Sequence, residues 1–285
     1  MAKFNKIQTA ELDDKDTRVI LSGNTLEVAQ MAVEPNIQDR IRKIDRDYYV
    51  FLETGELCKY DHDKEKTSHW TNIQKTIHKI RWLINHNFQA GDTFITLTYA
   101  QPDGKPMRDT KKLQEDMDTY LKALRRRIKP LKYLYVVEPQ ETGSWHTHLI
   151  ISGKHDVDYI KLWPHGEPWC QKIEYMDEIT NIGAYVSAYL TSLKEGQKGS
   201  RLHFYPEYMK IYRHSQNVVF PPILKLSGDE IKKIVGDISP DYSETILVSD
   251  DSDNLVQSIK RLYYNMSESK KSNVVSRIKK GETTK

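Results

Sequence analysis

The sequence predicts an α+β fold: an antiparallel sheet that carries helices on one face. Three observations predict it. Segments with the three- and four-residue apolar spacing of helices alternate with short apolar segments typical of strands. Two of these strand-like segments are close enough in sequence to form a hairpin. A content of 38% hydrophobic and 29% charged residues is typical of a soluble globular protein and excludes a membrane protein.

The first helix and the first strand follow directly from these patterns. A helix is expected from about residue 70 to 83, because its apolar residues recur every three or four positions: Trp70, Ile73, Ile77, Ile80 and Ile84. Gly91 and Asp92 interrupt the pattern, and residues 93–99 then form an apolar strand. A turn rich in Pro and Gly follows at residues 102–106.

The next elements complete the predicted sheet. A helix over residues 111–128 has one apolar stripe and ends before Pro130; the stripe contains Leu113, Met117, Tyr120, Leu121, Leu124 and Ile128. Strands are expected at 133–137, at 145–151 and around 170–175, and a further helix at 183–194. This order of strand, helix, hairpin, strand and helix is the pattern of a ferredoxin-like or RNA-recognition-type sheet.

The flanking segments are expected to form appendages. Residues 1–66 are predicted to be an N-terminal extension containing a hairpin, with Tyr48–Leu52 and Leu57–Tyr60 as its strands. Residues 67–225 would be the central domain. Residues 226–285 are predicted to be a C-terminal helical extension, with a helix marked by Leu255, Ile259, Leu262 and Tyr263 and a disordered basic tail from Lys270.

Two histidines lie two residues apart on the strand at 145–151. His146 and His148 would therefore project from the same face, while Thr147 faces away. Two adjacent imidazoles form half of a site for a divalent metal, although such a pair can also be two surface histidines.

The hairpin predicts a third metal ligand. If its turn is centred near Thr142, Glu138 lies opposite His146 and Val136 lies opposite His148. Glu138 would then share the face of both imidazoles, and this set of ligands suits Mn²⁺ or Mg²⁺. A shift in register would favour Gln140 or Glu141 instead, and Glu138 could also simply end the strand.

Two tyrosines lie four residues apart on the helix expected at 183–194. Tyr185 and Tyr189 would lie on one helix face, where they either pack on the sheet or act as nucleophiles beside the metal. Lys194 follows them, and it would either lower the pKa of a tyrosine or complement the helix dipole.

With these residues in place, the sequence resembles the HUH endonucleases, and most of all the rolling-circle replication initiators of Gram-positive plasmids and single-stranded DNA phages. Three motifs carry the resemblance in order: Phe94-Ile-Thr-Leu-Thr-Tyr99, His146-Thr-His148, and Tyr185-x-x-x-Tyr189 with Lys194 downstream. Ile211-Tyr-Arg-His-Ser215 is similar to the closing segment of the family. Thr147 and Ala188 depart from the family pattern, which has a bulky apolar residue and often a lysine at these places.

The resemblance implies a metal-dependent enzyme that nicks and joins single-stranded DNA at an origin hairpin. One tyrosine would form a 5′-phosphotyrosine and release a 3′-OH that primes a host polymerase. Because the chain has no phosphate-binding G-x-x-x-x-G-K-[ST] motif, unwinding would require a host helicase.

Two other functions remain open at this stage. The same chemistry would serve an HUH transposase or a relaxase of a mobile element. Alternatively, the sheet would be a non-enzymatic module that binds single strands by stacking bases on Tyr99, Tyr133 and Tyr135.

Composition bears on location and partners. No apolar run approaches the roughly 20 residues that cross a bilayer, and the N-terminus lacks the apolar core of a signal peptide, so a cytoplasmic protein without membrane contact is expected. Two cysteines, Cys58 and Cys170, exclude a disulfide framework. The net charge is only +3, but a basic cluster marks either a phosphate contact or a solvated helix end: Lys122, Arg125, Arg126, Arg127, Lys129 and Lys132.

Overall fold

The computed structural model describes residues 3–32, 41–45, 47–52, 54–59, 67–175, 179, 182, 204–206, 209–249 and 252–282. The chain divides into two compact units. The central unit is His69–Phe220, and the terminal unit combines Met1–Ser68 with Pro221–Lys285. Both units have antiparallel sheets with helices, so the predicted α+β class is confirmed.

The central unit is built on a five-stranded sheet in the order β10-β7-β9-β8-β11, and every neighbouring pair is antiparallel. Its strands are β7 (Thr93–Thr98), β8 (Tyr133–Pro139), β9 (Trp145–Ile151), β10 (Trp169–Lys172) and β11 (Tyr212–His214). Helix α2 (Thr110–Arg127) joins β7 to β8, and a short 3-10 turn, η1 (Pro102–Gly104), precedes it. Because β9 lies between β7 and β8, the three strands and α2 form a split βαβ unit.

Helix α2 forms where the sequence supplies both a cap and an apolar stripe. The Asp109 side chain accepts hydrogen bonds from the backbone N–H groups of Lys111 and Lys112, and so satisfies the first turn. The buried stripe packs against the sheet: Leu113, Met117, Tyr120, Leu121 and Leu124. The predicted limits of this helix are correct to within one residue.

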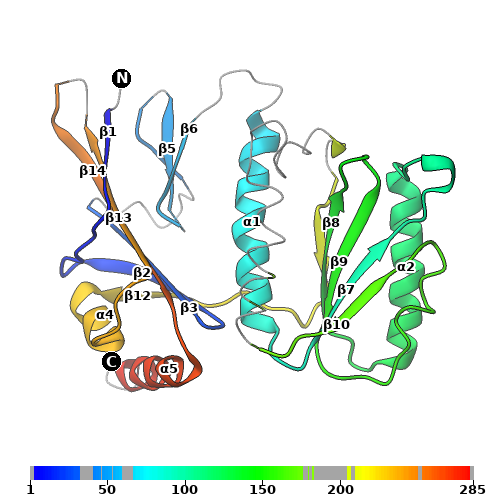
Figure 1. Ribbon diagram of the computed structural model, residues 1–285. Coiled ribbons are helices and arrows are strands. Elements are labelled where there is room, and N and C mark those ends of the chain that lie inside the picture. Colours follow the sequence, from blue (N-terminus) through cyan, green and yellow to red (C-terminus); the bar gives the residue numbers. More distant parts are fainter. Residues whose placement is uncertain are drawn as a thin grey trace. The chain divides into compact units, whose positions relative to one another are not determined.

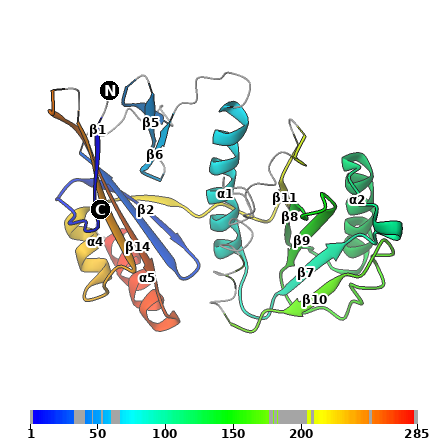
Figure 2. The ribbon, with the colours of Figure 1, turned by 45° about the horizontal axis from the view of Figure 1, so that its top comes forward.

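The expected placement of helices on one face is wrong. Helix α1 (Thr67–Asn87) and α2 lie on opposite faces of the five-stranded sheet, as Figures 1 and 2 both show. The reason lies in β8, in which all seven residues are buried, so that both faces of the strand need a cover. The ferredoxin-like assignment stays a prediction. The split βαβ order supports it, but residues 152–168, between β9 and β10, contain no α-helix.

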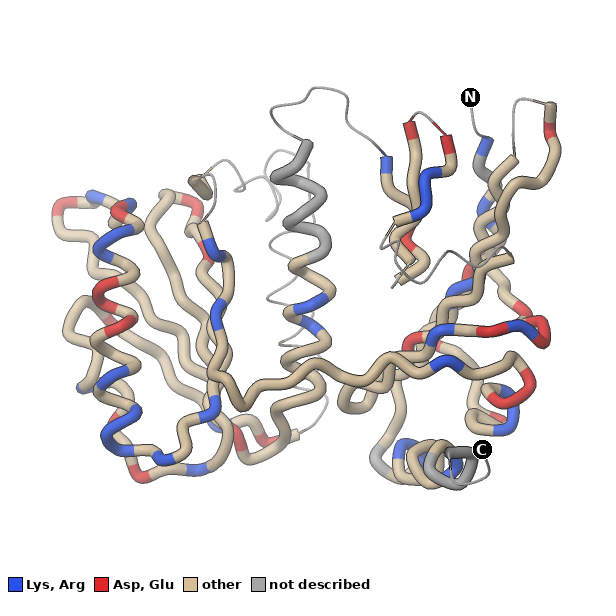
Figure 3. The backbone as a smooth tube through the Cα atoms, turned by 180° about the vertical axis from the view of Figure 1, so that it is seen from behind, with Lys and Arg blue, Asp and Glu red and all other residues tan. Residues whose placement is uncertain are grey.

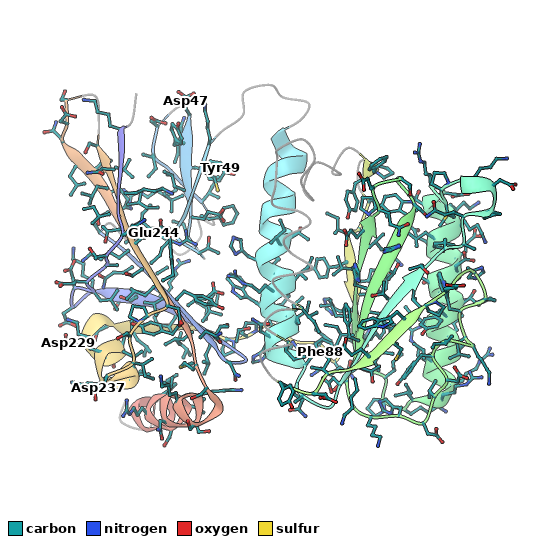
Figure 4. The ribbon with its side chains drawn as sticks, in the orientation of Figure 1. Asp47, Tyr49, Phe88, Asp229, Asp237 and Glu244 are labelled. Atoms are coloured by element: carbon teal, nitrogen blue, oxygen red, sulfur yellow. The ribbon has the colours of Figure 1, made fainter. Side chains whose placement is uncertain are left out.

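The terminal unit has a six-stranded sheet in the order β1-β13-β14-β3-β2-β12. The strands are β1 (Lys3–Ile7), β2 (Asp16–Ser22), β3 (Thr25–Met31), β12 (Ile223–Ser227), β13 (Tyr242–Ser249) and β14 (Leu255–Asn265). Helices α4 (Gly228–Val235) and α5 (Glu268–Glu282) pack on part of this sheet through a shared apolar cluster that includes Ile231 and Val274. In Figure 4, Asp229 and Asp237 mark the position of α4, and Glu244 lies on β13.

A second, three-stranded sheet belongs to the same unit. It consists of β4 (Ile41–Lys43), β5 (Tyr48–Phe51) and β6 (Glu56–Lys59), and β5–β6 is the hairpin predicted from the sequence. Val50 and Leu52 share an apolar cluster with Ile246, Val248 and Ile259 of the six-stranded sheet. The hairpin therefore covers a face of that sheet rather than one of its edges.

The two expected extensions share one sheet. Strand β1 pairs with β13, and β2 pairs with β12 as well as with β3, so both chain ends contribute to the same core. The charged run at residues 61–66, expected to be a linker, lies outside the described residues.

Two details of the C-terminal prediction are wrong. Residues 255–265 form strand β14 rather than a helix, because Ile259 packs on the three-stranded sheet whereas Leu262 packs with α4 and α5. This change of face gave buried residues three apart, which imitates helical spacing. The basic tail forms helix α5, which is anchored by the buried Val274 and Ile278 four residues apart. No helix among the described residues is long and apolar enough to cross a membrane.

Candidate active site

The sheet register places the three predicted metal ligands on one face. Glu138 pairs with His146, and Val136 pairs with His148, as the sequence predicted. On the other side of β9, His146 pairs with Thr98 and His148 with Thr96. Residues opposite each other on neighbouring strands share a face, so the carboxylate and both imidazoles project together with the two threonines.

Glu138 and His148 form a buried pair. His148 Nε2 lies 2.9 Å from Glu138 Oε2, and both residues are almost completely buried. His146 is half-buried, and its ring centroid lies 6.3 Å from that of His148. Within the described part of the chain, no group of three or more His, Cys, Asp and Glu side chains is arranged to hold a metal ion. The Glu138–His148 hydrogen bond occupies one potential ligand atom of each side chain, and a metal would have to replace it.

The Thr96 hydroxyl makes such an exchange feasible. It lies 3.2 Å from His148 Nδ1. An ionised carboxylate only accepts hydrogen bonds, so Nε2 carries the ring hydrogen and the Thr96 hydroxyl donates to Nδ1. If Nε2 bound a metal instead, Nδ1 would carry the hydrogen and the same hydroxyl would accept it. Phe94 stacks on the His148 ring at 5.8 Å and fixes its plane. Two imidazoles and a carboxylate in this environment fit Mn²⁺ or Mg²⁺.

The two rival ligands lie in the hairpin turn. The last paired residues of the hairpin are Pro139 and Trp145, so Gln140 and Glu141 follow the end of the ladder. The Gln140 side-chain oxygen accepts a hydrogen bond of 2.9 Å from Gln101, and Glu141 is exposed. The register therefore favours Glu138, although ligation itself stays a prediction.

The predicted nucleophiles Tyr185 and Tyr189, and Lys194 beside them, lie outside the described residues, so their roles stay predictions. Among the described tyrosines, Tyr205 lies close to Glu138. Its hydroxyl donates a 2.7 Å hydrogen bond to the Val137 carbonyl, and its ring packs on Trp145. Burial, with a smaller contribution from the Glu138 charge, raises the pKa of Tyr205 well above its usual value. A buried phenol with a raised pKa and a backbone partner is a structural residue rather than a nucleophile.

The tyrosines proposed for stacking in a non-enzymatic module are buried. Tyr99, Tyr133 and Tyr135 are only 7%, 5% and 3% exposed. The Tyr99 hydroxyl donates to Asp116 of α2 at 3.0 Å, and Tyr133 packs beneath Arg125. These rings belong to the core, so they provide no platform for bases.

A loop that the sequence analysis did not single out fastens the end of β7 beside His146. The Trp163 indole N–H donates 2.6 Å to the Thr98 carbonyl, and the Ala100 N–H donates 2.8 Å to the His165 carbonyl. Gly166 lies so close that an added Cβ would be 2.4 Å from the Thr98 carbonyl oxygen. Only the identity of Gly166 signals this contact in the sequence, and a single glycine is too common to interpret.

The closing motif forms the edge of the same sheet. Residues 212–214 are β11, and Ser215 fixes them to β8. The Ser215 N–H donates to the Tyr133 carbonyl, and its hydroxyl oxygen accepts from the Tyr133 N–H, both at 3.0 Å. This segment therefore supports β8, the strand that carries Glu138.

The basic cluster lies at the other end of β8. Figure 3 shows Lys and Arg residues gathered at the C-terminal end of α2, which leads to Tyr133. Arg125 donates to the Tyr133 hydroxyl at 3.0 Å. The Lys132 ammonium lies 5.9 Å from the ring centroid of Phe88, labelled in Figure 4, and burial lowers the pKa of Lys132. Glu138 is five residues along the strand from Tyr133, so a phosphate held by this cluster would not be the one beside Glu138.

Comparison with known proteins gives one match. Residues 92–194 are similar to the family model of replication-associated proteins of the ORF2 type. Neither the curated proteins nor the solved structures contain a significant match. The matched residues begin just before β7 and extend to Lys194, so they include every predicted site residue. The match supports assignment of this chain to a replication initiator family.

Proposed function

We propose that this protein initiates rolling-circle replication by nicking and rejoining single-stranded DNA at an origin. The observation that carries the proposal is the placement of Glu138, His146 and His148 on one sheet face, within the residues similar to replication-associated proteins. The sequence resemblance to HUH initiators of Gram-positive plasmids and phages supplies the chemistry. In a host cell, the protein would act in the cytoplasm with a helicase and a polymerase.

The three ligands would hold Mn²⁺ or Mg²⁺, which polarises the scissile phosphate when it is bound. Tyr185 or Tyr189 attacks the phosphorus through its phenol oxygen, and the bond to the 3′ oxygen breaks. The 5′ side is left on the tyrosine, and the 3′-OH carries the proton that the phenol has lost. Lys194 would stabilise phenolate character in the attacking tyrosine, because a nearby cation lowers the pKa of a phenol.

The direct test is formation of a covalent protein–DNA adduct. The full chain is incubated with labelled single-stranded DNA from the replicon that encodes it and with Mn²⁺, and adducts are resolved on denaturing gels. We expect an adduct that is lost in EDTA and in the His146→Ala/His148→Ala double variant. Replacing Tyr185 and Tyr189 singly by Phe would identify the first nucleophile.

The tyrosine variants also decide against the proposal. If the Tyr185→Phe/Tyr189→Phe double variant formed as much adduct as the wild type, the paired tyrosines would not be the nucleophiles. If no single-stranded DNA of the replicon gave an adduct with any divalent cation, the nicking function would be wrong.

A further inference from the structure

An exposed tryptophan lies in the same row of the sheet as His148. The register pairs Trp169 of β10 with Thr96, Thr96 with His148, and His148 with Val136. Directly paired residues project from the same face. Trp169 therefore lies on the face of the candidate site, at the β10 edge of the sheet.

Exposure on this face increases towards the β10 edge. Glu138 and His148 are buried, Thr96, Thr98 and His146 are half-buried, and Trp169 is 52% exposed. Residues of β7 that project from the opposite face, such as Ile95 and Leu97, are fully buried. Among the described residues of these strands, the site is therefore most open on the side of Trp169.

Trp169 is joined to His148 through one aromatic ring. Its indole meets the Phe94 ring edge-on, at 6.2 Å between centroids and 76° between planes. Phe94 in turn stacks on His148 at 5.8 Å. Phe94 thus fixes one side of the indole, and half of the side chain is left to solvent.

We infer that Trp169 is a stacking platform for a base of the single-stranded DNA substrate, close to the scissile phosphate. The inference rests on the proposed function. An exposed indole offers a flat apolar face that stacks on any base, and such stacking is the usual way in which proteins bind single strands without reading sequence. Two strand spacings of about 4.8 Å separate Trp169 from His148, roughly 10 Å in total. That distance corresponds to a few nucleotides of a single strand at about 3.4 Å or more each.

The test separates base stacking from phosphate binding. Binding is measured in the Tyr185→Phe/Tyr189→Phe background, which is expected not to cleave, with labelled oligothymidylate and with an abasic oligomer of equal length and charge. We expect Trp169→Ala to weaken binding of oligothymidylate by about 5- to 100-fold. Binding of the abasic oligomer should be unchanged, and Trp169→Phe should keep most of the affinity for oligothymidylate.

A matched control addresses exposed aromatic residues in general. Tyr242 is also 52% exposed, but it lies in the terminal unit. Tyr242→Ala should leave both affinities unchanged. Thermal unfolding and Mn²⁺ binding of each variant show whether Trp169→Ala disturbs the packing of Phe94 on His148.

Three outcomes would overturn the inference. Equal binding of oligothymidylate by Trp169→Ala and by its parent would overturn it and leave the nicking function standing, provided that the wild type forms the adduct. An equal loss for both oligomers, with lower thermal stability, would assign Trp169 a structural role only. Failure of the parent to bind either oligomer would overturn both the inference and the proposed function.

Discussion

At the scale of single residues, the candidate site depends on a carboxylate whose partner is also a predicted metal ligand. Glu138 is buried and contacts His148. Replacing Glu138 by Gln keeps an oxygen that can accept the His148 hydrogen bond but removes the charge that would hold a divalent cation. We therefore expect Glu138→Gln to fold normally and to bind Mn²⁺ on the order of 100-fold more weakly, as measured by titration calorimetry.

Glu141→Gln is the matched control for this prediction. It makes the same chemical change three residues away, in the exposed turn. Its Mn²⁺ affinity should equal that of the wild type. A larger loss in Glu141→Gln than in Glu138→Gln would show that the ligand had been assigned to the wrong residue.

Tyr205 gives a second prediction at this scale. Tyr205→Phe removes the hydrogen bond to the Val137 carbonyl but keeps the packed ring. Urea unfolding should show a loss of about 1 kcal/mol, whereas adduct formation should persist. Loss of the adduct in Tyr205→Phe, with retention in Tyr185→Phe, would instead identify Tyr205 as the nucleophile.

The sequence could predict the residues of the site better than their surroundings. The two-residue spacing of His146 and His148 and the hairpin centre at Thr142 were enough to place Glu138 opposite His146. Trp169 and Gly166 were not found, because their importance comes from contacts between segments distant in sequence. The predicted strand near Trp169 began one residue too late, at Cys170.

At the scale of elements, the strands of the central unit were predictable where their apolar residues are continuous. Strands β8 and β9 are buried on both faces, and their apolar runs mark them clearly. The same runs indicate a cover on each face, which the prediction of helices on one face missed. Strand β14 was mistaken for a helix because different partners cover its two faces.

The loop that fastens β7 provides a prediction at this scale. In Gly166→Ala, the methyl group would meet the backbone of Thr98 and Ala100, so the loop or the end of β7 must shift. Because Thr98 pairs with His146, we expect both weaker Mn²⁺ binding and a lower rate of adduct formation. Gly104→Ala is the control, since its added methyl meets nothing within 4 Å and only its φ of +70° opposes the change. If the two variants behaved alike, the position of the loop would not matter to the site.

At the scale of the whole molecule, the two units should respond differently to truncation. A chain ending at Pro240 lacks β13, β14 and α5, which leaves β1 without its partner strand and opens both apolar clusters of the terminal unit. We expect limited proteolysis to remove the N-terminal strands of this variant rapidly and to leave a resistant fragment close to His69–Phe220.

A second truncation serves as the comparison. A chain ending at Met266 keeps all six strands and loses only α5, whose buried contacts come mainly from Val274 and Ile278. Its N-terminal strands should be cleaved more slowly than those of the chain ending at Pro240. Equal cleavage of the terminal and central units in the shorter variant would contradict their independence.

The pairing of β1 with β13 also determines the order in which the chain can fold during synthesis. Lys3 has to wait for Ser249 before the two residues can pair, by which time the whole central unit has been made. The strands of the central unit lie much closer together in sequence and can assemble first, because domains generally fold as units while the ribosome is still working. An interrupted translation product would therefore contain a complete nicking sheet beside N-terminal strands that have no sheet to join.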